Sequence, residues 1–403
     1  MIDRPYYLDA LTRFRDTQRL VKVIVGVRRS GKSSLLDLYR ESLLHDGVAE
    51  ESILELNFES LALSHIDSPQ ALDAHIAAHA FPDGKRYLFL DEVHLVPEWE
   101  RAVNSLRLDP RNDIYVTGSN SRLLDSELAS LLSGRYVRIE VFPLSFAEYC
   151  RFRGPEAMSR PEAAFNDYLA TGGLPGQFDL RDDPAVRAQY IDGVLNTIIT
   201  KDIVAHRDVR DFDALMKIIR YLAANIGNLV TASGIAAYLA GTGRRITSDT
   251  VDAYLRLLEE AYLFYRAKRE DLKGKSTMKT NDKLYIVDLG FRMATTGLGT
   301  PDLGRLLENV VYFELRRRGS LVSIGKYGAE EVDFVAFTPL DGTAYFQVTL
   351  TINEESTCQR ELRPLRAIRD SYPKTILSLD TVRTPDYDGI RHENLIDWLL
   401  RRD

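Results

Sequence analysis

The sequence predicts an α/β protein of several domains, and three observations support this prediction. The chain has 403 residues, more than the roughly 250–300 at which a single hydrophobic core stops growing. Its first part alternates short apolar strands with apolar-periodic helices, which is typical of a parallel sheet. From about Lys283 the α/β pattern returns after a long helical region. We therefore expect an N-terminal domain with a parallel sheet and a separate C-terminal α/β domain.

The composition excludes several classes of protein. Apolar residues at 45% and charged residues at 28% are typical of a folded globular chain. The N-terminus is charged where a signal peptide is apolar, and no run approaches the roughly 18 apolar residues of a membrane span. Only Cys150 and Cys358 are present, too few for a disulfide framework. We expect a cytoplasmic protein with no membrane partner, and the net charge of −7 argues against coating nucleic acid by charge alone.

The stretch "VIVGVRRSGKSSLLDL" fits the pattern G-x-x-x-x-G-K-[ST] between an apolar strand and a helix. Glycines let several backbone N–H groups point into one concavity at the helix N-terminus, which suits a phosphate group. Lys32 is predicted to reach the β- and γ-phosphates, and the Ser33 hydroxyl to bind Mg²⁺. The predicted nucleotide-binding residues are Gly26, Arg28, Arg29, Ser30, Gly31, Lys32, Ser33 and Ser34.

A second strand, in "KRYLFLDEVHLV", delivers Asp91 and Glu92 at its C-terminal end. Ligands of parallel sheets bind at this end of the strands. We expect Asp91 to hold Mg²⁺ and Glu92 to polarise the attacking water, because one carboxylate must serve the ion and another the γ-phosphate. His94 is interpreted as a packing residue.

A third strand, in "DIYVTGSNSRLL", ends in Thr117, Gly118, Ser119 and Asn120, and a polar side chain there can contact the γ-phosphate or its water. Asn120 and Ser119 are both candidates, and the spacing does not choose between them. Arg135 follows a glycine in "LSGRYVRIEVF" and is a candidate for stabilising phosphoryl charge, in cis or from a neighbouring subunit; an ordinary solvated arginine is the alternative. Because no N-K-x-D tetrapeptide is present, ATP is preferred to GTP.

Together with "YLATGGLPG", "LENVVYFELRRRG" and "EVDFVAF", these motifs occur in an order that resembles one family over nearly the whole chain. The family is that of the bacterial and archaeal AAA-type ATP-binding proteins that carry a C-terminal domain of unknown function. The resemblance implies a P-loop ATPase core in which Asp91 and Glu92 form the Walker B pair. AAA-like cores often place the nucleotide at a subunit boundary, so a homo-oligomer is expected.

We predict four segments. Residues 1–152 form the ATPase core, and residues 153–210 a helical lid or connector. Residues 211–280 have three helical stretches separated by turn signals, which is the helix order of a winged helix. Basic residues there can face DNA phosphates, although such modules also bind proteins; these residues are Arg244, Arg245, Arg266, Lys268 and Arg269.

Residues 281–403 resemble a restriction-endonuclease-like domain. Such a site uses a helix glutamate, a strand aspartate and an acid-x-lysine strand, which here correspond to Glu308 or Glu314, to Asp333, and to Gln347 with Thr349. Because one acid and the lysine are missing, we expect the nuclease fold without efficient DNA cleavage. A lysine from elsewhere, such as Lys326, is the main alternative source of the missing cation.

Two functions from different classes are compatible with these motifs. The first is an ATPase whose Mg²⁺-dependent hydrolysis of ATP moves the C-terminal domains, on DNA or a DNA-bound partner. The second is a slow nucleotide-gated switch whose C-terminal half recruits a protein. An ATP-regulated nuclease is a further alternative.

Overall fold

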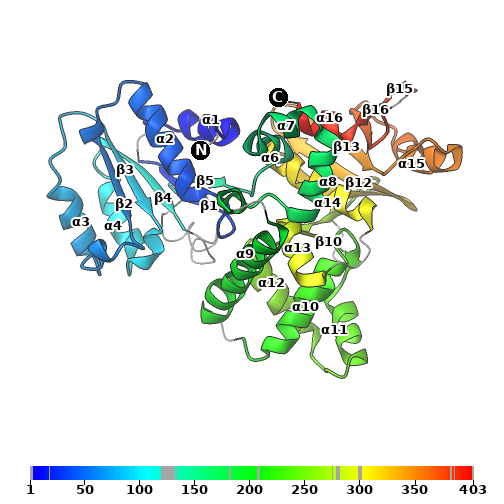
Figure 1. The fold of residues 1–403 in the computed structure, drawn as a ribbon, viewed down its shortest axis with the longest axis horizontal. Helices are drawn as coiled ribbons and strands as arrows, with labels where there is room; N and C mark the ends of the chain where they lie inside the picture. The colour runs from blue at the N-terminus through cyan, green and yellow to red at the C-terminus, as the bar shows by residue number, and fades with distance from the viewer. Residues whose placement is uncertain are drawn as a thin grey trace. The chain divides into compact units, whose positions relative to one another are not determined.

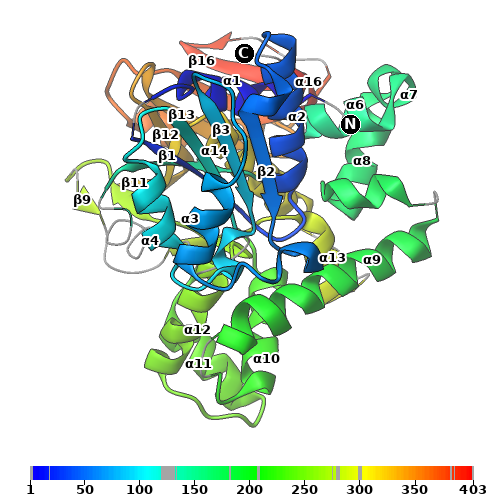
Figure 2. The same cartoon turned by 90° about the vertical axis from the view of Figure 1, so that its left-hand side faces the viewer.

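A computed structural model gives the fold of the chain (Figures 1 and 2). It describes residues 3–17, 19–118, 132, 134–180, 183–206, 209–274, 276–277, 282–297, 302–381, 384 and 386–401. The chain divides into two compact units, residues 1–143 and 144–403, here termed the N-terminal and C-terminal units. Each unit is described separately below.

The N-terminal unit is built on a parallel sheet with the strand order β2-β3-β4-β1-β5. Because all five strands run in the same direction, their carboxyl ends lie along one edge, at Asn57, Asp91, Thr117, Val25 and Glu140. The strands are β1 (Val21–Val25), β2 (Ile53–Asn57), β3 (Arg86–Asp91), β4 (Asn112–Thr117) and β5 (Tyr136–Glu140). The predicted parallel sheet is confirmed.

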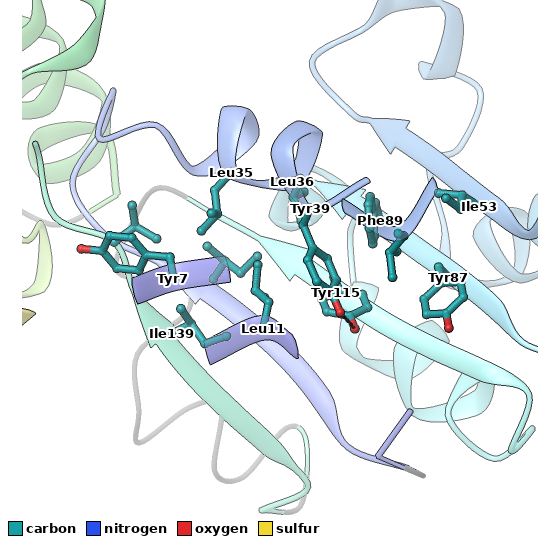
Figure 3. Close-up of a cluster of buried hydrophobic side chains, with 13 residues drawn as sticks. Tyr7, Leu11, Leu35, Leu36, Tyr39, Ile53, Tyr87, Phe89, Tyr115 and Ile139 are labelled. Carbon is teal, nitrogen blue, oxygen red and sulfur yellow. Dashed lines mark hydrogen bonds between the residues drawn. The ribbon is translucent and has the colours of Figure 1, made fainter. Parts of the chain in front are cut away.

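Helices cover both faces of this sheet, which explains why β1 and β4 are buried along their whole length. On one face α1 (Pro5–Arg13) and α2 (Lys32–His45) pack on a core that includes Tyr39, Phe89 and Tyr115 (Figure 3). The Tyr39 and Tyr115 hydroxyl groups lie 3.1 Å apart within this core. On the other side lie α3 (Pro69–Ala77) and α4 (Trp99–Leu106), which pack against each other (Figure 2).

A buried ion pair lies beneath α2, between the first and fourth strands. Lys22 of β1 donates to the carboxylate of Asp113 on β4, and both residues are almost fully buried. The other carboxylate oxygen of Asp113 accepts from the Tyr115 hydroxyl at 2.8 Å and from the Asp16 amide at 3.0 Å. Burial lowers the pKa of Lys22, and the charge of Asp113 offsets part of that effect. The pair therefore joins β1 to β4 inside the core.

The C-terminal unit begins with helices and contains two sheets. A three-stranded antiparallel sheet has the order β6-β10-β7, and an eight-stranded mixed sheet has the order β15-β16-β14-β13-β12-β11-β8-β9. Its helices are α6 (Phe146–Arg153), α7 (Pro155–Ser159), α8 (Pro161–Thr171), α9 (Pro184–Thr197), α10 (Phe212–Ala224), α11 (Ala232–Gly241), α12 (Ser248–Glu260), α13 (Leu289–Thr296), α14 (Leu303–Arg317), α15 (Glu355–Ala367) and α16 (Leu395–Leu400). Its strands are β6 (Leu229–Val230), β7 (Phe264–Ala267), β8 (Arg269–Asp271), β9 (Ser276–Thr277), β10 (Asp282–Ile286), β11 (Leu321–Tyr327), β12 (Glu330–Thr338), β13 (Gly342–Val348), β14 (Lys374–Ser378), β15 (Asp386–Tyr387) and β16 (Ile390–Asn394).

Two strands link the predicted segments 211–280 and 281–403 more closely than the sequence analysis expects. Strand β10, from the later segment, completes the small sheet with β6 and β7. Strand β8, from the earlier segment, pairs in parallel with β11 in the large sheet. The chain that follows β7, where a winged helix has its wing, is thus part of the C-terminal sheet. The two segments share backbone hydrogen bonds and form one unit.

The buried ion pair gives the first prediction. Replacing Lys22 with Met leaves the Asp113 carboxylate buried without its cation, and breaking such a pair costs about 3–5 kcal/mol. We expect Lys22→Met to lower the free energy of unfolding by that amount in urea titrations. The control variant Lys85→Met, at a more exposed position, should change it by less than about 1 kcal/mol. A stable Lys22→Met variant would show that the pair does not hold the sheet together.

Candidate functional site

The loop between β1 and α2 lies at the carboxyl edge of the N-terminal sheet. Gly26 has a φ of 142°, and a side chain there would overlap the carbonyl oxygen of Val141. Gly31 has a φ of 93° and is the N-cap of α2. Both glycines of the motif are thus required by backbone geometry. The loop leads directly into the N-terminus of α2, as the sequence predicts.

The side chains of this loop differ in exposure. Lys32 is buried, and its Nζ donates to the carbonyl oxygens of Gly26 at 3.2 Å and Val27 at 3.1 Å. Ser33 and Ser34, the next two residues of α2, are exposed. Of the two arginines, Arg29 is exposed and has a φ of 65°, whereas Arg28 is half-buried. The ammonium group of Lys32 therefore lies within the curve of the loop, at the start of a helix.

A residue that the sequence analysis missed stabilises the conformation of this loop. Arg4, from the segment before α1, donates to the carbonyl oxygens of Ser30 at 3.1 Å and Phe142 at 2.9 Å, and its guanidinium lies over the Tyr7 ring. The hydroxyl of Ser30 is buried, and no partner for it is found among the described residues. No motif marks Arg4, because its contacts join positions that are far apart in the sequence.

The carboxylate of Asp91 is held from both neighbouring strands. The Asn57 side-chain amide at the end of β2 donates to Oδ2 at 2.9 Å, and the Thr117 hydroxyl at the end of β4 donates to Oδ1. Thr117 also accepts the backbone N–H of Glu92 at 2.9 Å. Neither Asn57 nor Thr117 is among the predicted site residues, although both end a strand next to β3. These contacts fix Asp91 and the backbone of Glu92 at the edge.

Glu92 lies in an unusual position for a glutamate. Its φ of 52° is in the left-handed region, which non-glycine residues seldom adopt. Burial raises the pKa of its carboxyl group, and Asp91 raises it further, whereas Lys32 and Arg28 act in the opposite direction. His94 Nδ1 lies 3.3 Å from Glu92 Oε2, so this histidine contacts a candidate site residue. The structure thus brings Lys32, Asp91 and Glu92 into one electrostatic environment.

Of the three remaining candidate residues, the structure describes Arg135 but not Ser119 or Asn120. Ser119 and Asn120 lie outside the described residues, so the structure does not place them. Arg135 precedes β5, and its carbonyl oxygen accepts from the Val21 amide at the first residue of β1. The two strands run in parallel, and therefore Arg135 lies at the opposite end of the sheet from the loop, about 13 Å along β1. Burial lowers the pKa of Arg107, and the charges of Arg135 and Arg19 lower it further. A catalytic role for Arg135 within its own chain does not fit this position.

The predicted nuclease-like residues of the C-terminal unit gather at a separate cavity of about 710 Å³. Glu308, Asp333, Gln347 and Thr349 line it, whereas Glu314 lies elsewhere on α14 and pairs with Arg318 at 3.0 Å. Burial raises the pKa of Asp333 to about 8, to which the neighbouring charge of Glu308 contributes. Lys326, the predicted alternative cation, is not among the lining residues. The cavity also contains Lys283 of β10, which the sequence analysis did not identify.

The basic residues of segment 211–280 are largely neutralised by carboxylates of the same unit. Arg244 pairs with Asp211, Arg266 pairs with Glu259 at 2.6 Å, and Arg269 pairs with Glu331 at 2.9 Å. Arg245 and Lys268 are exposed. Three of the five predicted phosphate contacts are therefore engaged in ion pairs within the C-terminal unit.

Comparison with known proteins identifies the class to which the N-terminal unit belongs. A family described as "AAA domain" matches residues 18–150, and a domain of unknown function (DUF8612) matches residues 162–302. The second match ends before the three strands β11, β12 and β13. The Walker-type ATPase paby2304 of Pyrococcus abyssi is similar in fold, with a TM-score of 0.54 and 16% identity over 73% of this chain and 96% of that chain. The N-terminal unit is an AAA-type P-loop domain.

Two relatives extend the similarity to the whole chain. An uncharacterized protein of Haemophilus influenzae is 39% identical over 404 residues, covering 100% of this chain and 99% of the relative. The uncharacterized protein MJ1544 of Methanocaldococcus jannaschii is 28% identical over 90% of this chain and 80% of the relative. The chain belongs to the family of AAA-type P-loop proteins that these relatives represent. In the described part of the chain, no helix has the length and apolar character needed to span a membrane.

The position of Lys32 gives the second prediction. We expect Lys32→Ala to abolish nucleotide binding or turnover without unfolding the protein, because the Lys32 ammonium group donates to loop carbonyl oxygens and does not pack in the apolar core. Binding of a fluorescent ATP analogue and thermal unfolding should be measured on the same sample. Lys85→Ala is the matched control. A folded Lys32→Ala variant that binds and hydrolyses ATP normally would exclude this loop as the nucleotide site.

Proposed function

We propose that this protein is a Mg²⁺-dependent ATPase whose hydrolysis cycle moves its C-terminal unit. The observation that carries the proposal is the gathering, at one sheet edge, of a P-loop with its buried lysine and of the Asp91–Glu92 pair. The loop fits a phosphate group because its glycines leave the backbone free to curl, its helix begins at Lys32, and the exposed Ser33 hydroxyl adjoins that N-terminus.

Each residue of the edge has a distinct role in this proposal. The backbone from Gly26 to Ser34 and the Lys32 ammonium would bind the phosphates of ATP. Ser33 and Asp91 would hold Mg²⁺, which supplies charge neutralisation at the phosphates when it is bound. Asn57 and Thr117 position Asp91, and Glu92 accepts the proton of the attacking water. Asn120, with Ser119 as the alternative, remains our candidate for contacting the γ-phosphate.

The slow nucleotide-gated switch remains the second candidate, and one observation favours it. Arg244, Arg266 and Arg269 are paired with carboxylates, and β8 is bound into the large sheet. A DNA contact through this segment would have to compete with these interactions, whereas a protein partner need not. Under the switch hypothesis, the winged-helix-like segment and the nuclease-like domain recruit that partner when ATP is bound.

A turnover assay with and without DNA separates the two functions. A motor that acts on DNA should hydrolyse ATP several-fold faster when duplex or single-stranded DNA is added. A switch should hydrolyse slowly in both conditions and become more resistant to proteolysis when ATP binds. The double variant Arg245→Gln/Lys268→Gln removes the two exposed members of the five predicted phosphate contacts and should reduce any stimulation that depends on them.

The third prediction concerns Glu92. We expect Glu92→Gln to retain ATP binding and to slow hydrolysis by about two orders of magnitude or more, the scale of a lost general base. Because burial raises the pKa of Glu92, its carboxylate should be lost on acidification at a higher pH than an exposed glutamate. The hydrolysis rate of the wild type should therefore rise with pH through that raised pKa, and the Glu92→Gln variant should lack this rise. Hydrolysis at the normal rate in Glu92→Gln would assign the proton transfer to another group.

The fourth prediction concerns Arg135, whose distance from the loop leaves a neighbouring subunit as the place where it can act. We propose that the protein forms a homo-oligomer in which Arg135 contacts the nucleotide of the adjacent subunit. Mixing inactive Arg135→Ala with inactive Lys32→Ala protein should restore part of the activity, because some sites combine an intact arginine with an intact loop. If mixed oligomers form and remain inactive, Arg135 has no such role.

A further inference from the structure

Charged and polar side chains from five elements line the cavity of the C-terminal unit. Lys283 comes from β10, Glu308 from α14, Glu331 and Asp333 from β12, Gln347 from β13 and Glu361 from α15. In a metal-dependent centre of this layout, the carboxylates would share a divalent cation, which prefers oxygen ligands. The charges at its centre are instead satisfied by the protein itself.

Lys283 is the cation at the centre of this arrangement. Its Nζ lies 3.1 Å from Glu331, 3.2 Å from Glu308 and 3.8 Å from Asp333. The side chain is only 2% exposed, so these carboxylates are its counter-ions. Their negative charges hold the pKa of Lys283 above its ordinary value in spite of burial. An ammonium group with three carboxylates around it, two of them buried, keeps its charge and its position.

The carboxylates around Lys283 also form hydrogen bonds and ion pairs with other groups of the protein. Glu308 accepts from Arg305 at 2.8 Å, Glu331 pairs with Arg269 at 2.9 Å, and Glu361 pairs with Arg360 at 2.8 Å. Asp333 accepts the backbone N–H of Val348 at 2.9 Å, and Gln347 donates to Glu361 at 2.9 Å. With Lys283 in place between these carboxylates, no three acidic, histidine or cysteine side chains in the described part of the chain gather closely enough to hold a metal ion.

We propose that Lys283 takes the place of the divalent cation in this centre. The positive charge that a metal ion would supply to Glu308, Glu331 and Asp333 is built into the protein, and a second cation at the same place would meet electrostatic repulsion. The centre is therefore independent of metal and does not cleave nucleic acid. The sequence predicts no efficient cleavage because Gln347 and Thr349 stand where the acid and the lysine are needed. Lys283 adds a second reason, because its charge takes the place of the metal ion.

The origin of Lys283 gives the centre a structural role. Strand β10 pairs with β6 and β7 in the small sheet, whereas Glu331 and Asp333 lie on β12 of the large sheet. The lysine thus forms a buried ionic link between the two sheets of the C-terminal unit. The pairing of β8, the strand that follows β7, with β11 is a second connection between the two sheets.

The fifth prediction tests this inference by removing the lysine from the full-length protein. Lys283→Ala should expose the carboxylates to water and metal, so it should bind Mn²⁺ at least tenfold more tightly than the wild type, and Mn²⁺ should raise its melting temperature. Both gains should disappear in Lys283→Ala/Asp333→Asn. Lys283→Arg retains the charge and should resemble the wild type, as should the control Lys326→Ala on β11. All variants should carry Lys32→Ala and be measured without nucleotide, so that the P-loop does not contribute.

The wild-type centre provides a test that does not require the Lys283→Ala variant to fold. In the Lys32→Ala background, Mn²⁺ binding should be the same with and without Asp333→Asn. Neither Mg²⁺ nor Mn²⁺ should support cleavage of duplex or single-stranded DNA. Cleavage in the presence of ATP is tested on protein that retains Lys32. Mn²⁺ binding or DNA nicking that Asp333→Asn abolishes would overturn the proposal. It would identify Lys283 and Glu361 as relocated members of an active nuclease centre. A folded Lys283→Ala variant that gains no Mn²⁺ affinity would also overturn it.

Discussion

The contacts of Asp91 are the constraint on which the N-terminal unit depends. Asn57 and Thr117 each reach its carboxylate from a neighbouring strand, and Thr117 also holds the backbone of Glu92. These bonds form only when β2, β3 and β4 end in register at one edge. The same register determines where the P-loop, which follows β1, lies relative to the two acids. The register of the strands therefore determines the geometry of the site.

The two units use buried charge in different ways. In the N-terminal unit, the Lys22–Asp113 pair stabilises β1 against β4, while Lys32, Asp91 and Glu92 lie at the sheet edge, where ATP can reach them in our proposal. In the C-terminal unit, Lys283 lies among three carboxylates, and nearby guanidinium groups pair with the acids around it. In our proposal, ATP hydrolysis at the first site moves the C-terminal unit, and such movement requires that this unit hold together. A buried ionic link between its two sheets is consistent with that requirement.

The sequence predicted the parallel sheet and the P-loop context correctly because both depend on local patterns, namely apolar strands and a glycine-bounded loop before a helix. It missed Arg4 and Asn57, and it preferred Ser119 and Asn120 to Thr117, because the contacts of these residues lie on segments distant in the sequence. It also missed Lys283 and named Lys326 instead, since proximity in sequence does not show that β10 lies beside the cavity. The predicted boundary between residues 280 and 281 does not account for β8 and β10, because each of these short strands pairs with a strand on the other side of it.

The most direct test of the central claim is the Mg²⁺ dependence of ATP hydrolysis in Thr117→Val. This variant keeps the size and shape of the side chain but removes the hydroxyl that holds Asp91 and Glu92. If the edge contacts organise the metal and water groups, half-maximal activity should require several-fold more Mg²⁺ and the maximal rate should fall, while ATP binding without Mg²⁺ is unchanged. An unaltered Mg²⁺ dependence and rate in a folded Thr117→Val protein would contradict the account.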